Sequence, residues 1–177
     1  MKSNRLIYAV LVLVGLTAAS CKKDHPEVLV SPVYPISGEW YVNVYNEDGS
    51  LARVEVKDKD GKITITQYAT LSTYNTSDNV NNVVWMKLWN STANYGLLGK
   101  VSCNVPAKTI SGDATNIAFT PNKGFKVLEG KVLLNATKLK GSKTIADSIY
   151  VKYSTETDGK TYVISGHRRS QYVEDQY

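Results

Sequence analysis

Short runs of alternating apolar and polar residues, separated by turn residues, cover most of this chain from residue 36 onward. In the first run, the side chains of Trp40, Val42 and Val44 fall on one face of an extended strand, because successive side chains point to opposite sides. Similar runs follow at 51–56, 63–66, 83–89, 97–105, 116–120, 125–135, 148–153 and 161–166. No stretch keeps a helical period, so the pattern predicts an all-β fold of about eight to ten strands.

Asp-Gly pairs at residues 48–49, 60–61 and 158–159 stand between these runs. Asp-Gly is a strong signal for a tight hairpin turn. Frequent local hairpins favour an antiparallel meander that closes into an up-and-down barrel, with an immunoglobulin-like sandwich as the alternative. The best places for a short helix are a turn or two within residues 79–84 or after Lys143.

The first residues follow a different pattern. Lys2 and Arg5 are followed by an almost unbroken apolar run over residues 6–16, by the small or polar residues 17–20 and by Cys21. A positive start, a short apolar stretch and small residues describe a secretory signal. The run is shorter than the roughly 20 apolar residues of a membrane-spanning helix. The cysteine directly after the small residues resembles a bacterial lipoprotein signal, which is cut so that Cys21 carries the lipid.

This signal divides the chain into three parts. Residues 1–20 are the signal peptide, residues 21–35 form an extended, proline-containing tether, and residues 36–177 form the folded domain. The partner implied at the N-terminus is a membrane, reached through lipidated Cys21. The expected location is the cell envelope, at the outer membrane, on either its periplasmic or its external side.

Charge and cysteine content narrow the possible functions. The formal net charge of +5 falls to +3 once the signal peptide is removed, because that segment holds Lys2 and Arg5 and no acidic residue. The remaining lysines and arginines are spread along the chain without a cluster, so nucleic acid is not an expected partner. If Cys21 is lipidated, Cys103 has no partner within the chain and is expected to be a small buried apolar side chain.

Few residues are candidates for catalysis. His167 is the one histidine in the predicted domain, and Ser165 lies two positions away on the same strand face. Alternate strand positions are about 6.6–7 Å apart at the backbone, and no Gly-x-Ser-x-Gly turn is present, so a hydrogen-bonded structural histidine is the simpler interpretation. One histidine is too few for a zinc or iron site, so we expect no metal and no cofactor.

Two segments carry a resemblance to a known family. Residues 36–41 (ISGEWY) contain the Gly-x-Trp core that resembles the first strand of lipocalins, and residues 165–169 (SGHRR) close the last strand. Together with residues 147–149, they resemble a Bacteroidetes lipoprotein family described as lipid-binding putative hydrolases, with a lipocalin-like barrel. The resemblance covers about residues 36–175 and implies no established catalytic residues.

The resemblance also implies that Trp40 closes one end of the barrel with an arginine of the last strand stacked on it. We expect Arg168 rather than Arg169, because Arg168 shares a strand face with Tyr162 and Ile164. On this interpretation, replacing Trp40 damages the fold far more than it weakens a ligand.

Aromatic residues gather in and beside the middle strands. They can line a cavity for an apolar ligand or pack the barrel interior, and the sequence leaves both open. The candidate ligand-binding residues are therefore Trp40, Tyr68, Tyr74, Trp85, Trp89, Phe125, His167 and Arg168. We expect a lipid-anchored envelope protein that binds a small apolar ligand such as a lipid. The alternatives are a hydrolase of unknown substrate and an accessory subunit of an outer-membrane complex.

Overall fold

The computed structural model describes residues 29–52, 54–57, 59–61, 63–66, 69–88 and 93–175. The strands are β1 (Gly38–Asn46), β2 (Val54–Lys57), β3 (Ile63–Thr66), β4 (Ala69–Asn75), β5 (Val83–Leu88), β6 (Leu97–Asn104), β7 (Thr109–Asn116), β8 (Lys123–Lys138), β9 (Ile145–Thr155) and β10 (Thr161–Arg168). A 3-10 helix, η1 (Val173–Asp175), follows the last strand. The described residues contain no α-helix, which confirms the all-β prediction.

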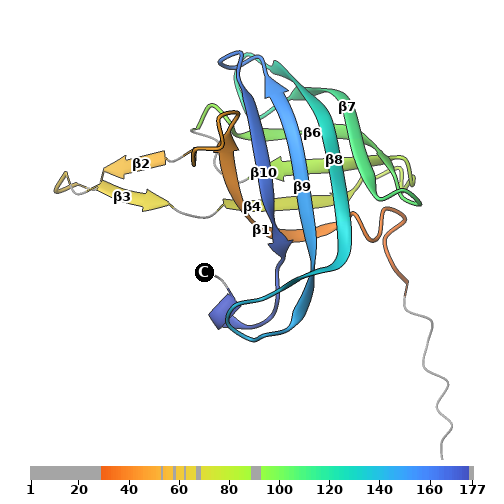
Figure 1. Ribbon diagram of the computed structural model, residues 1–177. Helices are drawn as coiled ribbons and strands as arrows, with labels where there is room; N and C mark the ends of the chain where they lie inside the picture. The colour runs from red at the N-terminus through yellow and green to blue at the C-terminus, as the bar shows by residue number, and fades with distance from the viewer. Residues whose placement is uncertain are drawn as a thin grey trace, which may run out of the picture.

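The strands form a closed antiparallel barrel in the order β1-β10-β9-β8-β7-β6-β5-β4 (Figure 1). From β4 to β10 each strand pairs with its neighbours in sequence, and β1 closes the barrel by pairing with both β4 and β10. Strands β2 and β3 form a separate two-stranded hairpin that projects from the barrel between β1 and β4. The structure therefore confirms the meander and the barrel.

The Asp-Gly turns lie where the sequence predicts them. Gly49, Gly61 and Gly159 have φ values of 83°, 76° and 71°, the left-handed region that glycine adopts without strain. The turn at Gly61 joins β2 to β3, and the turn at Gly159 joins β9 to β10. These local hairpins set the register of the neighbouring strands.

Large side chains fill the barrel interior. The alternation in β1 buries Trp40, Val42 and Val44, as predicted. The largest fully buried side chains of the described residues are Trp40, Tyr153, Ile36, Leu71, Met86, Leu97, Ile110, Ile149 and Ile164. Cys103 is buried as a free thiol, and burial raises the pKa of that thiol.

Three local predictions are wrong. The run at 116–120, predicted as a strand, lies in the turn between β7 and β8 except for Asn116. The segment 79–84 runs into β5 rather than into a helix, and the chain after Lys143 enters β9. In the last two places β-branched residues, Val83 and Ile145, start alternating runs that pair with a neighbouring strand. Packing also begins before residue 36, because Val33 is fully buried in the core.

The predicted signal peptide and Cys21 lie outside the described residues. In the part of the chain that the structure describes, no helix is long and apolar enough to cross a bilayer.

Candidate functional site

One end of the barrel is closed by Trp40 and Arg168. The Arg168 guanidinium carbon lies 4.3 Å from the centroid of the Trp40 ring, which confirms the predicted stacking. The indole is fully buried, and its Nε1 donates a hydrogen bond to Thr73 Oγ1 at 3.0 Å. Thr73 Oγ1 in turn donates to the carbonyl oxygen of Ile36 at 2.7 Å. These contacts tie β1 to β4 and to the chain that precedes the barrel.

The polar atoms of Arg168 are also engaged. Its Nε pairs with Asp147 Oδ2 at 2.9 Å, and its two terminal nitrogens donate to the carbonyl oxygens of Ser37 at 2.8 Å and Pro35 at 2.6 Å. A side chain at Gly38 would come within 2.2 Å of the guanidinium, so a larger residue there would push Arg168 away from these partners. With all these partners satisfied, the Trp40–Arg168 pair acts as a structural plug.

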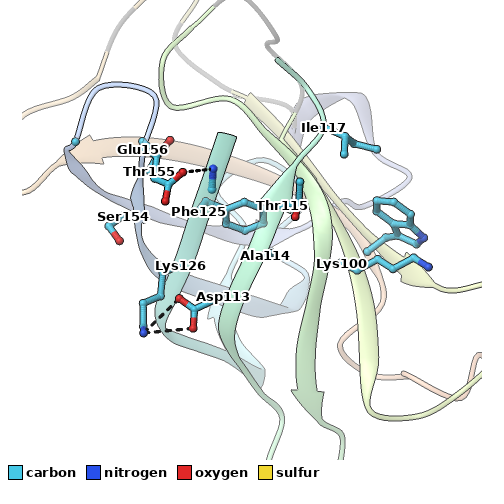
Figure 2. Close-up of a pocket in the computed structure, with 13 residues that line it drawn as sticks. Lys100, Asp113, Ala114, Thr115, Ile117, Phe125, Lys126, Ser154, Thr155 and Glu156 are labelled. Carbon is cyan, nitrogen blue, oxygen red and sulfur yellow. Dashed lines mark hydrogen bonds and ion pairs between the residues drawn. The ribbon is translucent and has the colours of Figure 1, made fainter. Parts of the chain in front are cut away.

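A larger feature is a groove of about 970 Å³ in the barrel wall (Figure 2). It crosses residues of β5 to β9 and the turns at one end of these strands. Its lining residues are Trp85, Lys100, Asp113, Ala114, Thr115, Ile117, Gly124, Phe125, Lys126, Ser154, Thr155, Glu156 and Gly159.

The groove follows an interruption in the pairing of β6 with β7. These strands pair only between residues 102–104 and 109–111, and the register of β7 against β8 shifts between Ile110 and Gly112. Beyond that point the strands are joined again by Asn116, whose side chain accepts from the Leu98 amide at 2.9 Å. Lys100 on β6 and residues 113–115 on β7 lie where these two strands do not pair with each other, and they line the groove.

Phe125 lies in this opening. Its ring occupies the space beside Gly99 on β6, where a Cβ would come within 2.6 Å of the ring edge and 2.5 Å of the Thr115 carbonyl oxygen. Phe125 is buried, yet it also lines the groove, and Figure 2 shows its ring between Glu156 on one side and Thr115 on the other. The absence of a side chain at Gly99 therefore lets an aromatic ring fill the gap in the wall.

Trp85 and Tyr74 lie on the outer face of the barrel. In β5 the buried positions are Val84, Met86 and Leu88, so Trp85 points outward, where its ring stacks on Tyr74 at 6.2 Å between centroids. These two residues therefore do not pack the barrel interior, one of the two roles that the sequence left open, because strand parity places Trp85 on the side opposite the core.

Some charged side chains of the groove have an ion-pair or hydrogen-bond partner and others do not. Lys126 pairs with Asp113 at 3.3 Å, and Glu156 accepts a hydrogen bond from the Gly124 amide at 2.6 Å, both drawn in Figure 2. Lys100 Nζ lies over the Trp85 ring at 5.3 Å. Within the described part of the chain it has no carboxylate partner within ion-pair distance. The groove therefore combines aromatic and aliphatic surface with one available cation.

A second, smaller pocket of about 210 Å³ gathers Ser165, His167 and Asp175 on the outer face of the barrel. His167 Nδ1 lies 3.0 Å from the Arg168 carbonyl oxygen, so Nδ1 carries the proton that it donates there and Nε2 is left without one in the neutral ring. The ring also makes an edge contact with Tyr41 at 5.9 Å between centroids. No hydrogen bond joins Ser165 to His167 or His167 to Asp175 among the described residues.

The Asp175 side chain in this pocket is almost fully buried, and its carboxylate is hydrogen-bonded to the protein. It accepts hydrogen bonds from the amide and hydroxyl of Ser142 at 2.8 and 2.7 Å and from the hydroxyl of Ser170 at 2.7 Å. Burial acts to raise the pKa of Asp175, but these hydrogen bonds and the nearby His167 outweigh it and hold the pKa below its ordinary value. The carboxylate thus fastens η1 to the turn between β8 and β9.

A family model described as lipid-binding putative hydrolase matches residues 25–173. The chain belongs to this family. A search of the curated proteins found no match. The description of the lipid-binding putative hydrolase family and the β-barrel together fit a lipid-binding role.

The predicted site residues of this family member do not form one site. Trp40 and Arg168 form the plug, Trp85 and Phe125 line the groove with Tyr74 stacked behind Trp85, and His167 lines the smaller pocket. Cys21, Tyr68 and Trp89 lie outside the described residues. Sequence reasoning missed Lys100, Thr115 and Glu156, which come from β6, β7 and the turn after β9 and meet at the groove only in the folded barrel. The described residues contain no cluster of three or more potential metal ligands.

Proposed function

We propose that the protein is a lipoprotein, held to the cell envelope by lipid on Cys21, that binds a lipid or similar amphipathic small molecule in the wall groove. One observation carries the choice of site: in a chain of a lipid-binding family, Phe125 and Trp85 are brought into one open groove of about 970 Å³. Small-molecule sites commonly have volumes of about 300–1,000 Å³, so the groove is large enough for an acyl chain.

The lining matches an amphipathic ligand. Trp85, Ala114, Ile117 and Phe125 offer apolar surface, and burial of an acyl chain against such surface gains about 0.8 kcal/mol for each CH₂ group removed from water. Lys100 stands beside Trp85 and provides a cation for an anionic head group. The barrel interior is a poorer candidate, because large side chains such as Trp40, Met86 and Tyr153 occupy it.

The groove can be blocked without touching the plug. Thr115→Trp places a large ring in the groove, and Thr109→Trp is a matched control, since both threonines are exposed on β7 and only Thr115 lines the groove. A fluorescent polyunsaturated fatty acid, cis-parinaric acid, serves as the probe. We expect Thr115→Trp to weaken binding at least about tenfold, a loss of roughly 1.4 kcal/mol, and Thr109→Trp to leave it unchanged.

Equal affinity of both variants and the unchanged protein would contradict the groove as the site. Urea midpoints measured on the same samples separate blocked binding from loss of folding.

The proposed anchor has its own test. The positive start, the apolar run and the small residues before Cys21 support lipidation at that position. Growth of the producing bacterium with labelled palmitate should label the unchanged protein in its envelope fraction. The Cys21→Ser variant should carry no label, and a labelled variant would exclude Cys21 as the anchor.

Hydrolysis is a second candidate, at the smaller pocket. The observation in its favour is that Ser165 and His167 share this pocket, with His167 Nε2 free to accept a proton. If this pocket is an esterase site, p-nitrophenyl esters are cleaved by the unchanged protein and not by Ser165→Ala or His167→Gln. Turnover that survives both substitutions would exclude it.

A further inference from the structure

Exposed apolar side chains gather at the barrel end where β1 begins. Strand β9 pairs with β10 only from Ser148 onward, so residues 145–147 and the end of β8 extend past the barrel, as the lower part of Figure 1 shows. The exposed apolar residues at this end are Tyr34, Leu133, Leu134, Ile145, Tyr172 and Val173, which we call the apolar edge.

Polar contacts hold the parts of the apolar edge together. The backbone amide of Asn135, next to Leu134, donates a hydrogen bond to Asp147 Oδ1 at 3.0 Å. Asp147 pairs with Arg168, and Arg168 donates to the carbonyl oxygen of Pro35, next to Tyr34. The chain before the barrel and the irregular end of β8 are therefore linked through successive hydrogen bonds.

The helix η1 is fixed to the same end. The carboxylate of Asp175 accepts hydrogen bonds from Ser142 in the turn between β8 and β9, which places Val173 beside this turn. The apolar edge thus combines three parts of the chain that hydrogen bonds hold together.

The chain that leads back to the proposed anchor starts at this surface. Leu29 and Val30 are exposed and lead to Tyr34 at this end of the barrel. Eight residue steps separate Leu29 from Cys21, so even a fully extended chain keeps Leu29 within about 28 Å of a lipid on Cys21. Monomeric soluble proteins rarely expose a large contiguous apolar patch, and a patch of that kind commonly marks a protein or membrane interaction site.

The charges nearby also favour a lipid surface. Lys138, Lys140 and Lys143 stand on and beside the turn between β8 and β9, and all are exposed. Of the acidic side chains there, Asp147 and Asp175 already accept hydrogen bonds from the protein, and Glu174 on η1 is exposed, so lysines outnumber exposed acidic residues at this turn. Anionic lipid head groups attract lysines in this position, and tyrosines such as those of the apolar edge are favoured at the membrane interface.

We propose that the apolar edge rests on the bilayer that holds the protein's own lipid anchor, with the groove facing away from the edge and open to the surroundings. This inference rests on the proposed anchoring at Cys21 and is independent of the ligand in the groove. Apolar side chains inserted at the head-group boundary add to the hold of the lipid and fix the orientation of the barrel.

A pair of leucines on β8 provides the test. Leu133, in the apolar edge, and Leu128, away from it, have nearly equal exposure, 48% and 47%. Leu133→Cys and Leu128→Cys are each made with Cys103→Ala, so that the buried thiol cannot react, and are labelled with a fluorescent dye. The lipidated proteins are then reconstituted into phosphatidylglycerol vesicles that contain brominated acyl chains.

We expect brominated lipid to quench the dye at position 133 at least about threefold more than the dye at position 128. Equal quenching of protein that floats with the vesicles would overturn the proposal and leave the anchor intact, whereas protein that does not float would overturn both. An Ile145→Cys reporter, at 61% exposure, repeats the measurement if Leu133→Cys folds poorly. Excimer formation between pyrene labels at position 133, without lipid quenching, would assign the edge to a second copy and also overturn the proposal.

Discussion

Replacement of Trp40 by alanine separates a structural plug from a ligand site. The indole is fully buried, and removal of a buried tryptophan side chain costs about 3–5 kcal/mol through lost transfer energy and the cavity left behind. Loss of the Arg168 guanidinium from the ring face adds about 0.5–2 kcal/mol. Together the loss is about 3.5–7 kcal/mol, a large part of the roughly 5–15 kcal/mol that stabilises an ordinary domain.

The milder Trp40→Phe variant keeps an aromatic ring for Arg168 and removes the Nε1 hydrogen bond to Thr73. We expect it to lose about 1–2 kcal/mol, so it remains folded while Trp40→Ala is close to unfolding. Urea unfolding followed by circular dichroism measures both, with the slope of the transition as a check on two-state behaviour.

Binding of cis-parinaric acid to Trp40→Phe completes the test. Because Trp40 does not line the groove, the Trp40→Phe variant should bind cis-parinaric acid with the same affinity as the unchanged protein. A folded Trp40→Ala variant with an unchanged unfolding midpoint and lost affinity would refute the plug and make Trp40 a ligand contact.

Three further substitutions test the packing of the site and the titration of buried groups. Gly99→Ala should lower the free energy of unfolding by about 1–3 kcal/mol in urea, because its Cβ would overlap the Phe125 ring; an unchanged midpoint would contradict this packing. Asp175→Asn should destabilise the protein at neutral pH. Since the pKa of Asp175 is held below its ordinary value of about 3.9, the difference from the unchanged protein should shrink as the pH falls below about 4, and a constant difference in acid melts would count against it. Burial raises the pKa of Tyr153 well above its ordinary value near 10, so the stability of the protein should fall as the pH rises beyond about 10. The Tyr153→Phe variant loses the 2.6 Å hydrogen bond to the Tyr95 carbonyl oxygen, which costs about 1 kcal/mol, and its stability should fall less steeply in alkaline melts. An equally steep fall would show that another group is responsible.

The sequence contains most of the information that determines the barrel. Alternation identifies the buried face of β1, and Asp-Gly pairs mark the turns at Gly61 and Gly159, because both signals act between residues close in sequence. Strand parity also selects Arg168 over Arg169 as the partner of Trp40.

The same parity explains the outward position of Trp85. The run Val84 to Leu88 places Trp85 on the face of Lys87 rather than with Val84, Met86 and Leu88, so a large apolar ring is not by itself a sign of a buried position. Lys87 was therefore a signal in the sequence that Trp85 points outward.

The groove could not be predicted in this way. It depends on the interruption of pairing between β6 and β7, on the register shift after Ile110, and on the fit of Phe125 against Gly99. These features arise between residues of different strands, and no pattern of neighbouring residues in the sequence shows how closely two strands approach each other. The smaller pocket likewise forms only when Asp175 is brought to the turn between β8 and β9.

Quenching of Trp85 by brominated stearic acid tests the groove most directly. The Trp89→Phe variant keeps Trp40 and Trp85, and the double variant Trp85→Phe/Trp89→Phe keeps only the buried Trp40. Bromine quenches tryptophan only at short range, so ligand in the groove should quench the fluorescence of Trp89→Phe and leave that of the double variant unchanged. Equal quenching of both variants would place the ligand beside Trp40 and contradict binding in the wall of the barrel.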